Sequence, residues 1–198
     1  MRTYRAVNLN VLWFLIALNV VLFIIEIAIG GYPITAANEV VSFLGLTPSL
    51  LSQQPWTIIS SMFVHGGLTH IIFNMIALYF LGSFLIRAAG EKSFLTIFFL
   101  GGMAGNVLFI LLTHPSSTGI GASGGIFALA GALAIMVPKM PVIIFPLPIP
   151  MPLWIAVIIL LFFSFLFAGI AWQAHLGGLL LGLVAGIIFK RKRRISYF

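Results

Sequence analysis

The stretch LNVLWFLIALNVVLFIIEIAIG, residues 9–30, decides the fold class of this chain. A helix needs about 20 consecutive apolar residues to cross a bilayer, and this run holds a single charged side chain, Glu26. Similar runs recur along the 198 residues, of which 62% are hydrophobic and only 7% charged. Soluble domains carry about 25% charged residues, so the chain is an integral membrane protein.

The fold is expected to be an all-α bundle with six transmembrane helices. Only helices and closed barrels satisfy their backbone hydrogen bonds in lipid. The apolar runs lack the alternation of barrel strands and are about twice as long. We therefore expect one membrane domain over residues 1–198. Its spans lie at about 9–30, 64–86, 94–113, 121–137, 152–168 and 173–190, followed by a basic tail at 191–198.

The positive charges support this topology. With six spans, all ten Lys and Arg residues fall on the side that holds both termini. The opposite side, formed by 31–56, 114–120 and 169–172, has none. The positive-inside rule places both termini in the cytoplasm. The run KRKRR at 190–194 directly follows a span, which is typical of an anchor near anionic lipid and not of a nucleic-acid site.

Two connections between spans are unusual. Residues 31–56 form a long external loop that is rich in apolar side chains, so we expect it at the membrane interface. Residues 138–152 hold six of the ten prolines and cannot form a regular helix. We expect this segment to run extended along the cytoplasmic face. The first run is not followed by a small-residue cleavage site, so we expect a retained span in a cell membrane, most simply a prokaryotic plasma membrane.

Polar side chains inside spans are costly and mark candidate functional sites. Spans two, four and six all run from outside to inside. His70 lies about two turns below the outer end of span two, and Asn74 follows at i+4 on the same face. Ser123 opens span four and His175 lies in the first turn of span six. These four residues therefore share one depth in the outer leaflet.

This set suits acyl transfer. Serine needs a base to remove its proton, and His175 can serve Ser123. No Asp or Glu lies at this depth in the three spans, which favours a Ser-His dyad over a triad. His70 and Asn74 can donate hydrogen bonds to an oxyanion, and the helix start at Ser123 favours an anion. Taken separately, each feature has a structural interpretation: Gly121 and Gly125 have the spacing of a helix-packing face, and either histidine could simply join two helices.

Other polar residues carry weaker expectations. Asn19 and Asn106 are expected to make structural hydrogen bonds. Glu26 is expected to snorkel to the interface or to tie down the long loop. His65 and His114 are interpreted as solvated loop histidines. No metal or cofactor is expected, because no His-x-x-x-His or paired carboxylate occurs.

Three motifs together resemble those of rhomboid intramembrane serine proteases. Gly121-Ala122-Ser123-Gly124 is similar to their Gly-x-Ser-Gly, and His70 to Asn74 is similar to their His-x-x-x-Asn. Ala174-His175-Leu176-Gly177-Gly178, with Gly182, is similar to their Ala-His-x-x-Gly-x-x-x-Gly. The resemblance runs from about Trp56 to Gly186, with the motifs in order and on the expected spans.

The resemblance implies specific roles. Ser123 would be the nucleophile and His175 its base. His70, Asn74 and the Ser123 N–H would form the oxyanion hole. Span five and the loop at 169–172 would gate and cap a site that opens to the external side. The substrate would be a transmembrane helix of another protein.

Two family features are absent. The family's Trp-Arg is Trp56-Thr57 here, and its Gly-x-x-x-Glu is Gly82 followed by Ile86. Their absence bears on how the long loop is anchored more than on the chemistry of the site. The favoured hypothesis is thus an intramembrane serine endopeptidase. Two alternatives stay open: a protein of the same fold that holds substrate helices without cutting them, and a small transporter or channel, which the absence of inverted repeats disfavours.

Overall fold

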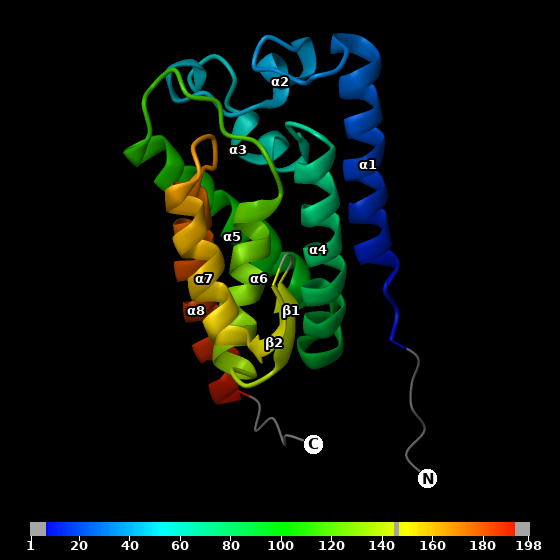
Figure 1. Cartoon of the computed structure of the whole chain (residues 1–198), viewed down its shortest axis with the longest axis vertical. Helices are drawn as coiled ribbons and strands as arrows, with labels where there is room; N and C mark the ends of the chain where they lie inside the picture. The colour runs from blue at the N-terminus through cyan, green and yellow to red at the C-terminus, as the bar shows by residue number, and fades with distance from the viewer. Residues whose placement is uncertain (1–6, 145–146, 193–198) are drawn as a thin grey trace.

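Six long helices form the body of the molecule and run roughly along its long axis (Figure 1). The computed structural model describes residues 7–144 and 147–192. The long helices are α1 (Asn10–Gly30), α4 (Leu68–Ala89), α5 (Glu91–Leu112), α6 (Ser123–Met136), α7 (Leu153–Leu166) and α8 (Trp172–Lys192). The predicted fold class, a helical membrane bundle, is confirmed.

The lengths of these helices differ. Four of them in the described part of the chain, α1, α4, α5 and α8, are long and apolar enough to cross a membrane. The other two, α6 and α7, have 14 residues each. Most side chains of α6 are buried by other helices, since this helix occupies the centre of the bundle.

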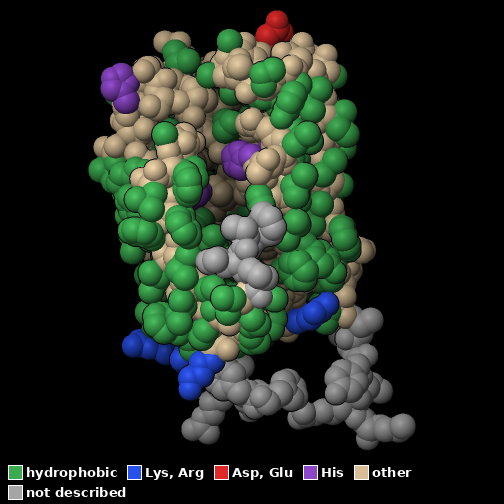
Figure 2. Space-filling view, in the orientation of Figure 1, with side chains coloured by type: hydrophobic (Ala, Val, Ile, Leu, Met, Phe, Trp, Pro, Cys, Tyr) green, Lys and Arg blue, Asp and Glu red, His purple; other side chains and the backbone are tan. Residues whose placement is uncertain are grey.

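The bundle has two distinct ends. Both described chain ends lie at one end, called here the terminal end (Figure 1). On the face shown in Figure 2, the Lys and Arg side chains also gather there. Arg2, Arg5, Arg193 and Arg194 lie outside the described residues, as does most of the predicted tail, because α8 continues to Lys192.

The opposite end, called here the loop end, carries the short helices. These are α2 (Glu39–Leu44), η1 (Pro48–Leu50), α3 (Thr57–Ser60) and η2 (Ser61–Phe63). Leu46 is fully buried and forms a β-bridge with Gly119. The Trp56 indole N–H donates to the Phe43 carbonyl at 2.8 Å, and the two rings lie 5.1 Å apart. The long loop is therefore anchored without the family's Trp-Arg pair.

Glycines let α6 and α8 approach until their backbones touch. A Cβ atom on Gly178 would collide with the Gly124 carbonyl oxygen, and one on Gly182 would collide with that of Ala128. Small residues at helix interfaces allow this approach in membranes. In α4, Gly82 packs against Leu12 and Phe94, and Ile86 is buried, so apolar packing replaces the family's Gly-x-x-x-Glu.

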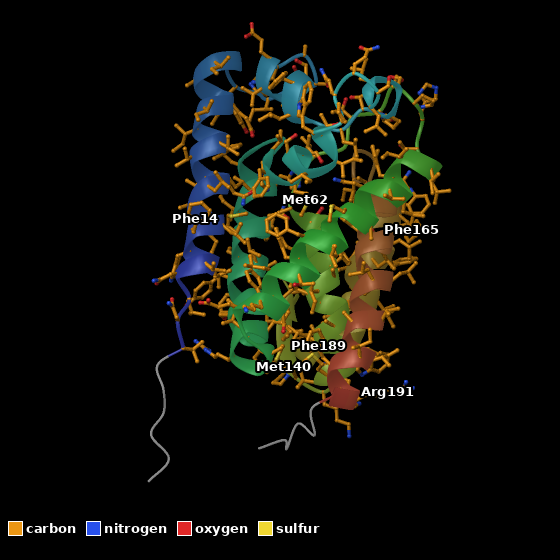
Figure 3. The ribbon with its side chains drawn as sticks, turned by 180° about the vertical axis from the view of Figure 1, so that it is seen from behind. Phe14, Met62, Met140, Phe165, Phe189 and Arg191 are labelled. Atoms are coloured by element: carbon orange, nitrogen blue, oxygen red, sulfur yellow. The ribbon has the colours of Figure 1, made fainter. Side chains whose placement is uncertain are left out.

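The proline-rich connection differs from its prediction. Its strands β1 (Pro141–Ile144) and β2 (Leu147–Pro152) pair antiparallel and stand in front of α6, along the bundle axis (Figure 1). Met140, which precedes β1, lies at the terminal end (Figure 3). The segment is extended, as expected, but it stands along the bundle axis and does not lie flat across the terminal end. Proline prevents a helix, and pairing satisfies backbone groups that lipid cannot.

Replacing Gly182 by valine should destabilise the protein, because the new side chain would push α8 away from the Ala128 backbone. Overpacking of this kind costs about 1–3 kcal/mol or more. Thermal unfolding in detergent measures the effect. Val184→Leu is the matched control, since Val184 lies on the same helix and is 56% exposed. Equal melting temperatures for the two variants would contradict the tight contact.

Candidate functional site

Ser123 and His175 meet at the loop-end halves of α6 and α8. The Ser123 Oγ and His175 Nε2 atoms lie 2.8 Å apart, within hydrogen-bonding distance. Ser123 is the first residue of α6, and His175 lies in the first turn of α8. Gly124 directly follows Ser123, and Gly178 lies about one turn after His175, so the contact between the two glycines brings the two side chains together.

The His175 ring is positioned by an aromatic side chain. It stacks on Phe127 with ring centroids 4.3 Å apart and an interplanar angle of 16°. The Nδ1 atom is buried and has no hydrogen-bond partner among the described residues, so no carboxylate orients the imidazole there. Sequence reasoning missed Phe127, although its place at i+4 from Ser123 puts it on the same helix face.

His70 faces Ser123 across Gly121. The Gly66 N–H donates to His70 Nδ1 at 3.4 Å, so a neutral ring carries its proton on Nε2. A Cβ atom on Gly121 would lie 2.7 Å from His70 Nε2 and 3.8 Å from Ser123 Oγ. The Nε2–H and the serine hydroxyl therefore border the same small volume.

The spacing of Gly121 and Gly125 suggested that both glycines pack helices, but Gly121 does not. It precedes α6 and has a φ of +114°, which disfavours side chains. Its missing Cβ leaves the space between His70 and Ser123 open. Gly125 does pack helices, because a Cβ atom there would meet Phe98 at 2.7 Å.

Asn74 is buried on α4, one helical turn after His70. Its Nδ2 donates to the His70 carbonyl at 2.9 Å, which uses one of its two N–H groups. The structure thus brings Ser123 and His175 into direct contact and sets His70 opposite them. It ties the Asn74 amide to its own helix.

The site opens on one side of the bundle. Figure 2 shows a hollow on the face that carries the strand pair, with histidine side chains inside it. The first N–H groups of a helix have no partner within it, and those of α6 lie at Ser123 in this region. The hollow therefore gives a route from the surface of the bundle to histidine side chains inside it.

A second polar cluster lies between α1 and the start of α4. Glu26 is fully buried, so it does not snorkel; both its carboxylate oxygens accept from the His65 N–H, at 3.3 and 3.2 Å. The Asn38 side chain donates to the Glu26 carbonyl at 2.9 Å. Glu26 therefore ties the long loop, through Asn38, and the chain just before α4, through His65, to α1, as one of its two interpretations predicted.

His65 was predicted to be solvated, and this is wrong. Its side chain is fully buried, and neither ring nitrogen has a hydrogen-bond partner in the described part of the chain. Its ring packs edge-on against that of His70, with centroids 5.0 Å apart. Burial, and secondarily the charge of His70, lower the pKa of His65 to about 3. His65 is buried because it lies between η2 and α4, where its backbone N–H meets Glu26 of α1 and its ring packs against His70.

The remaining polar residues, Asn106, Asn19 and His114, agree with their predictions. The Asn106 side chain donates to the Ile58 carbonyl at 2.7 Å and to Ser61 Oγ at 2.9 Å, which ties α5 to the loop end as a structural bond. Asn19 donates to the Leu15 carbonyl of its own helix at 2.7 Å. His114 is exposed, as predicted.

Comparisons with known proteins find a family and relatives for this chain. A family model described as the Rhomboid domain matches residues 52–192. The chain is 31% identical over 175 residues to Rhomboid protease GluP of Bacillus subtilis (strain 168), covering 86% of this chain and 33% of that protein. It is 26% identical over 187 residues to Putative rhomboid protease YdcA of the same organism, covering 94% and 92%. The chain thus spans about a third of one relative and most of the other.

Acid should destabilise the fold through His65. Its pKa is about 3 in the fold and about 6.5 in the unfolded chain. The unfolded chain therefore binds the proton first, and stability is lost as the pH falls from about 6.5 towards 3. We expect His65→Phe to remove about 2 kcal/mol of this loss at pH 5.

Melting temperatures in detergent at neutral pH and at about pH 5 test this expectation. His114→Phe is the control, because His114 is exposed. If His65→Phe keeps the wild-type pH dependence, His65 is not the group that resists protonation.

Proposed function

Because the chain belongs to the rhomboid family of intramembrane serine proteases, we propose that it is a serine endopeptidase that cuts transmembrane helices of other membrane proteins with Ser123 and His175. The observation that carries this proposal is the 2.8 Å separation of Ser123 Oγ and His175 Nε2. The proposed partners are transmembrane substrates in the bilayer.

In the first step, His175 Nε2 takes the proton of the Ser123 hydroxyl while Oγ attacks the scissile carbonyl. The stack on Phe127 holds the imidazole plane in place of a carboxylate. The same nitrogen then gives the proton to the leaving amine, which produces an acyl-enzyme. Water, deprotonated by His175, releases the acyl group and restores the serine.

The negative charge of the tetrahedral intermediate needs donors. His70 Nε2–H suits this role, because the Gly66 N–H on Nδ1 favours that tautomer and the ring faces Ser123 across Gly121. The Ser123 backbone N–H at the start of α6 is the second donor. The free N–H of Asn74 is the third.

The proposed orientation follows from charge. The described Lys and Arg side chains visible in Figure 2 gather at the terminal end. The positive-inside rule then puts that end in the cytoplasm and the loop end outside. Cleavage would thus occur near the external face, where water reaches the acyl-enzyme.

A fluorophosphonate probe tests the nucleophile. Purified protein should be labelled, Ser123→Ala should not be, and His175→Ala should lose labelling because no base remains. Melting temperatures of the variants confirm folding. Equal labelling of Ser123→Ala and the wild type would exclude the protease assignment.

Removing one oxyanion donor should slow cleavage without abolishing it. His70→Phe keeps an aromatic ring but loses the Nε2–H, so we expect kcat to fall by about 100- to 1000-fold. Cleavage of a single-span protein, followed by mass spectrometry, measures the rate. A rate within a few-fold of wild type would remove His70 from the oxyanion site. Complete loss together with a lower melting temperature would assign it a structural role.

A further inference from the structure

Glu26 lies on the buried face of α1. The buried residues of this helix recur at helical spacing, and they are Leu12, Leu15, Asn19, Phe23 and Glu26. This face meets the rest of the bundle, where α1 packs beside α4 (Figure 1). A carboxylate that is buried among apolar helices is costly unless it accepts hydrogen bonds. The Glu26 side chain therefore needs a hydrogen-bond donor inside the bundle.

The anchoring of the long loop does not use this carboxylate. The Asn38 side chain donates to the backbone carbonyl of Glu26, which any residue at position 26 would supply. Among the described residues, the carboxylate oxygens accept from the His65 N–H, at 3.3 and 3.2 Å. The two interactions of Glu26 are thus separable, and the carboxylate serves the chain just before α4.

Two successive backbone N–H groups connect the carboxylate to the candidate site. The His65 N–H donates to Glu26, and the next N–H along the chain, that of Gly66, donates to His70 Nδ1 at 3.4 Å. A bond of this length lies beyond the usual range for N–H donors. A small shift of the Gly66 N–H would therefore break it.

The chain after His65 has little stiffness of its own. Gly66 and Gly67 follow in the sequence, and Gly67 has a φ of +154°. Glycines leave the backbone free to adopt many conformations. The position of the Gly66 N–H thus depends on what holds His65, namely the Glu26 carboxylate and the packing of the buried His65 ring against His70.

We propose that Glu26 is a positioning residue for His70. By holding the His65 N–H, its carboxylate keeps the Gly66 N–H on His70 Nδ1, and the proton of the neutral ring then stays on Nε2, which faces Ser123 across Gly121. This inference rests on the proposed function, in which that proton stabilises the oxyanion. Without the Gly66 bond, the imidazole can carry its proton on Nδ1, and a lone pair on Nε2 would then face the oxyanion.

Kinetics of the full chain in lipid vesicles test this role. Glu26→Leu removes the acceptor, and we expect kcat for a single-span substrate to fall by about 10- to 100-fold, because one oxyanion donor is misplaced. KM should stay near the wild-type value, since the lost interaction forms in the transition state. Glu26→Gln keeps an acceptor oxygen and should keep kcat close to that of the wild type. Equal losses of kcat in Glu26→Leu and Glu26→Gln would overturn the proposal.

Asn38→Ala is the matched control, because it removes the loop contact to the Glu26 carbonyl and leaves the carboxylate in place. It should lower the melting temperature and leave kcat unchanged. If Asn38→Ala lowers kcat as much as Glu26→Leu does, Glu26 acts only by anchoring the loop, and the proposal is wrong.

A double variant shows whether the effect of Glu26 passes through His70. In His70→Phe protein, the further change Glu26→Leu should leave kcat unchanged, because the two residues act as one unit. A fall by the same factor in both backgrounds would contradict the proposed route.

The ring tautomer can be measured without catalysis. Nitrogen NMR of Ser123→Ala protein with isotope-labelled histidine should show a protonated Nε2 and an unprotonated Nδ1 for His70, assigned by the loss of its signals in His70→Phe protein. Glu26→Gln should keep this pattern and Glu26→Leu should lose it. A protonated Nδ1 in protein that retains Glu26 would overturn the proposal, whether or not Glu26→Leu folds. Absence of fluorophosphonate labelling in the wild type would refute the protease assignment instead.

Discussion

The backbone contact between α6 and α8 is the constraint on which the rest of this structure depends. Gly124 and Gly178 lack the side chains that would separate the two helices, and Gly182 continues the contact against Ala128. The close approach brings the Ser123 hydroxyl to 2.8 Å from the His175 imidazole. Dispersion between closely packed surfaces, and not the hydrophobic effect, joins helices in lipid, so small residues matter more here than large apolar ones.

Buried polar groups in this apolar molecule form hydrogen bonds that join separate segments of the chain. Glu26 accepts the His65 N–H, while the backbone of the same residue accepts from Asn38. The long loop and the start of α4 are thereby held against α1. Because His65 packs on His70, this anchoring extends to the edge of the candidate active site. Loop attachment and site geometry are thus parts of one connected structure.

Much of the site could be predicted from the sequence. His70, Ser123 and His175 lie at one depth because alternate spans run in the same direction, and the helical period places Asn74 below His70. The burial of His65 could not be predicted, since a histidine next to a span looks the same whether the chain passes outside or beneath the loop end. The tautomer of His70 depends on the Gly66 N–H, which is a local backbone bond without a sequence signal.

The sequence by itself determined the membrane environment, the helical fold class and the identity of the candidate residues, because apolar length, charge sorting and motif order are properties of the chain. The tertiary structure alone decided the 2.8 Å contact, the Phe127 stack and the upright position of the strand pair. The prolines at 138–152 exclude a regular helix, and this follows from the sequence and is seen in the structure. Only the tertiary structure places two paired strands along the bundle against α7, where their pairing satisfies backbone hydrogen bonds.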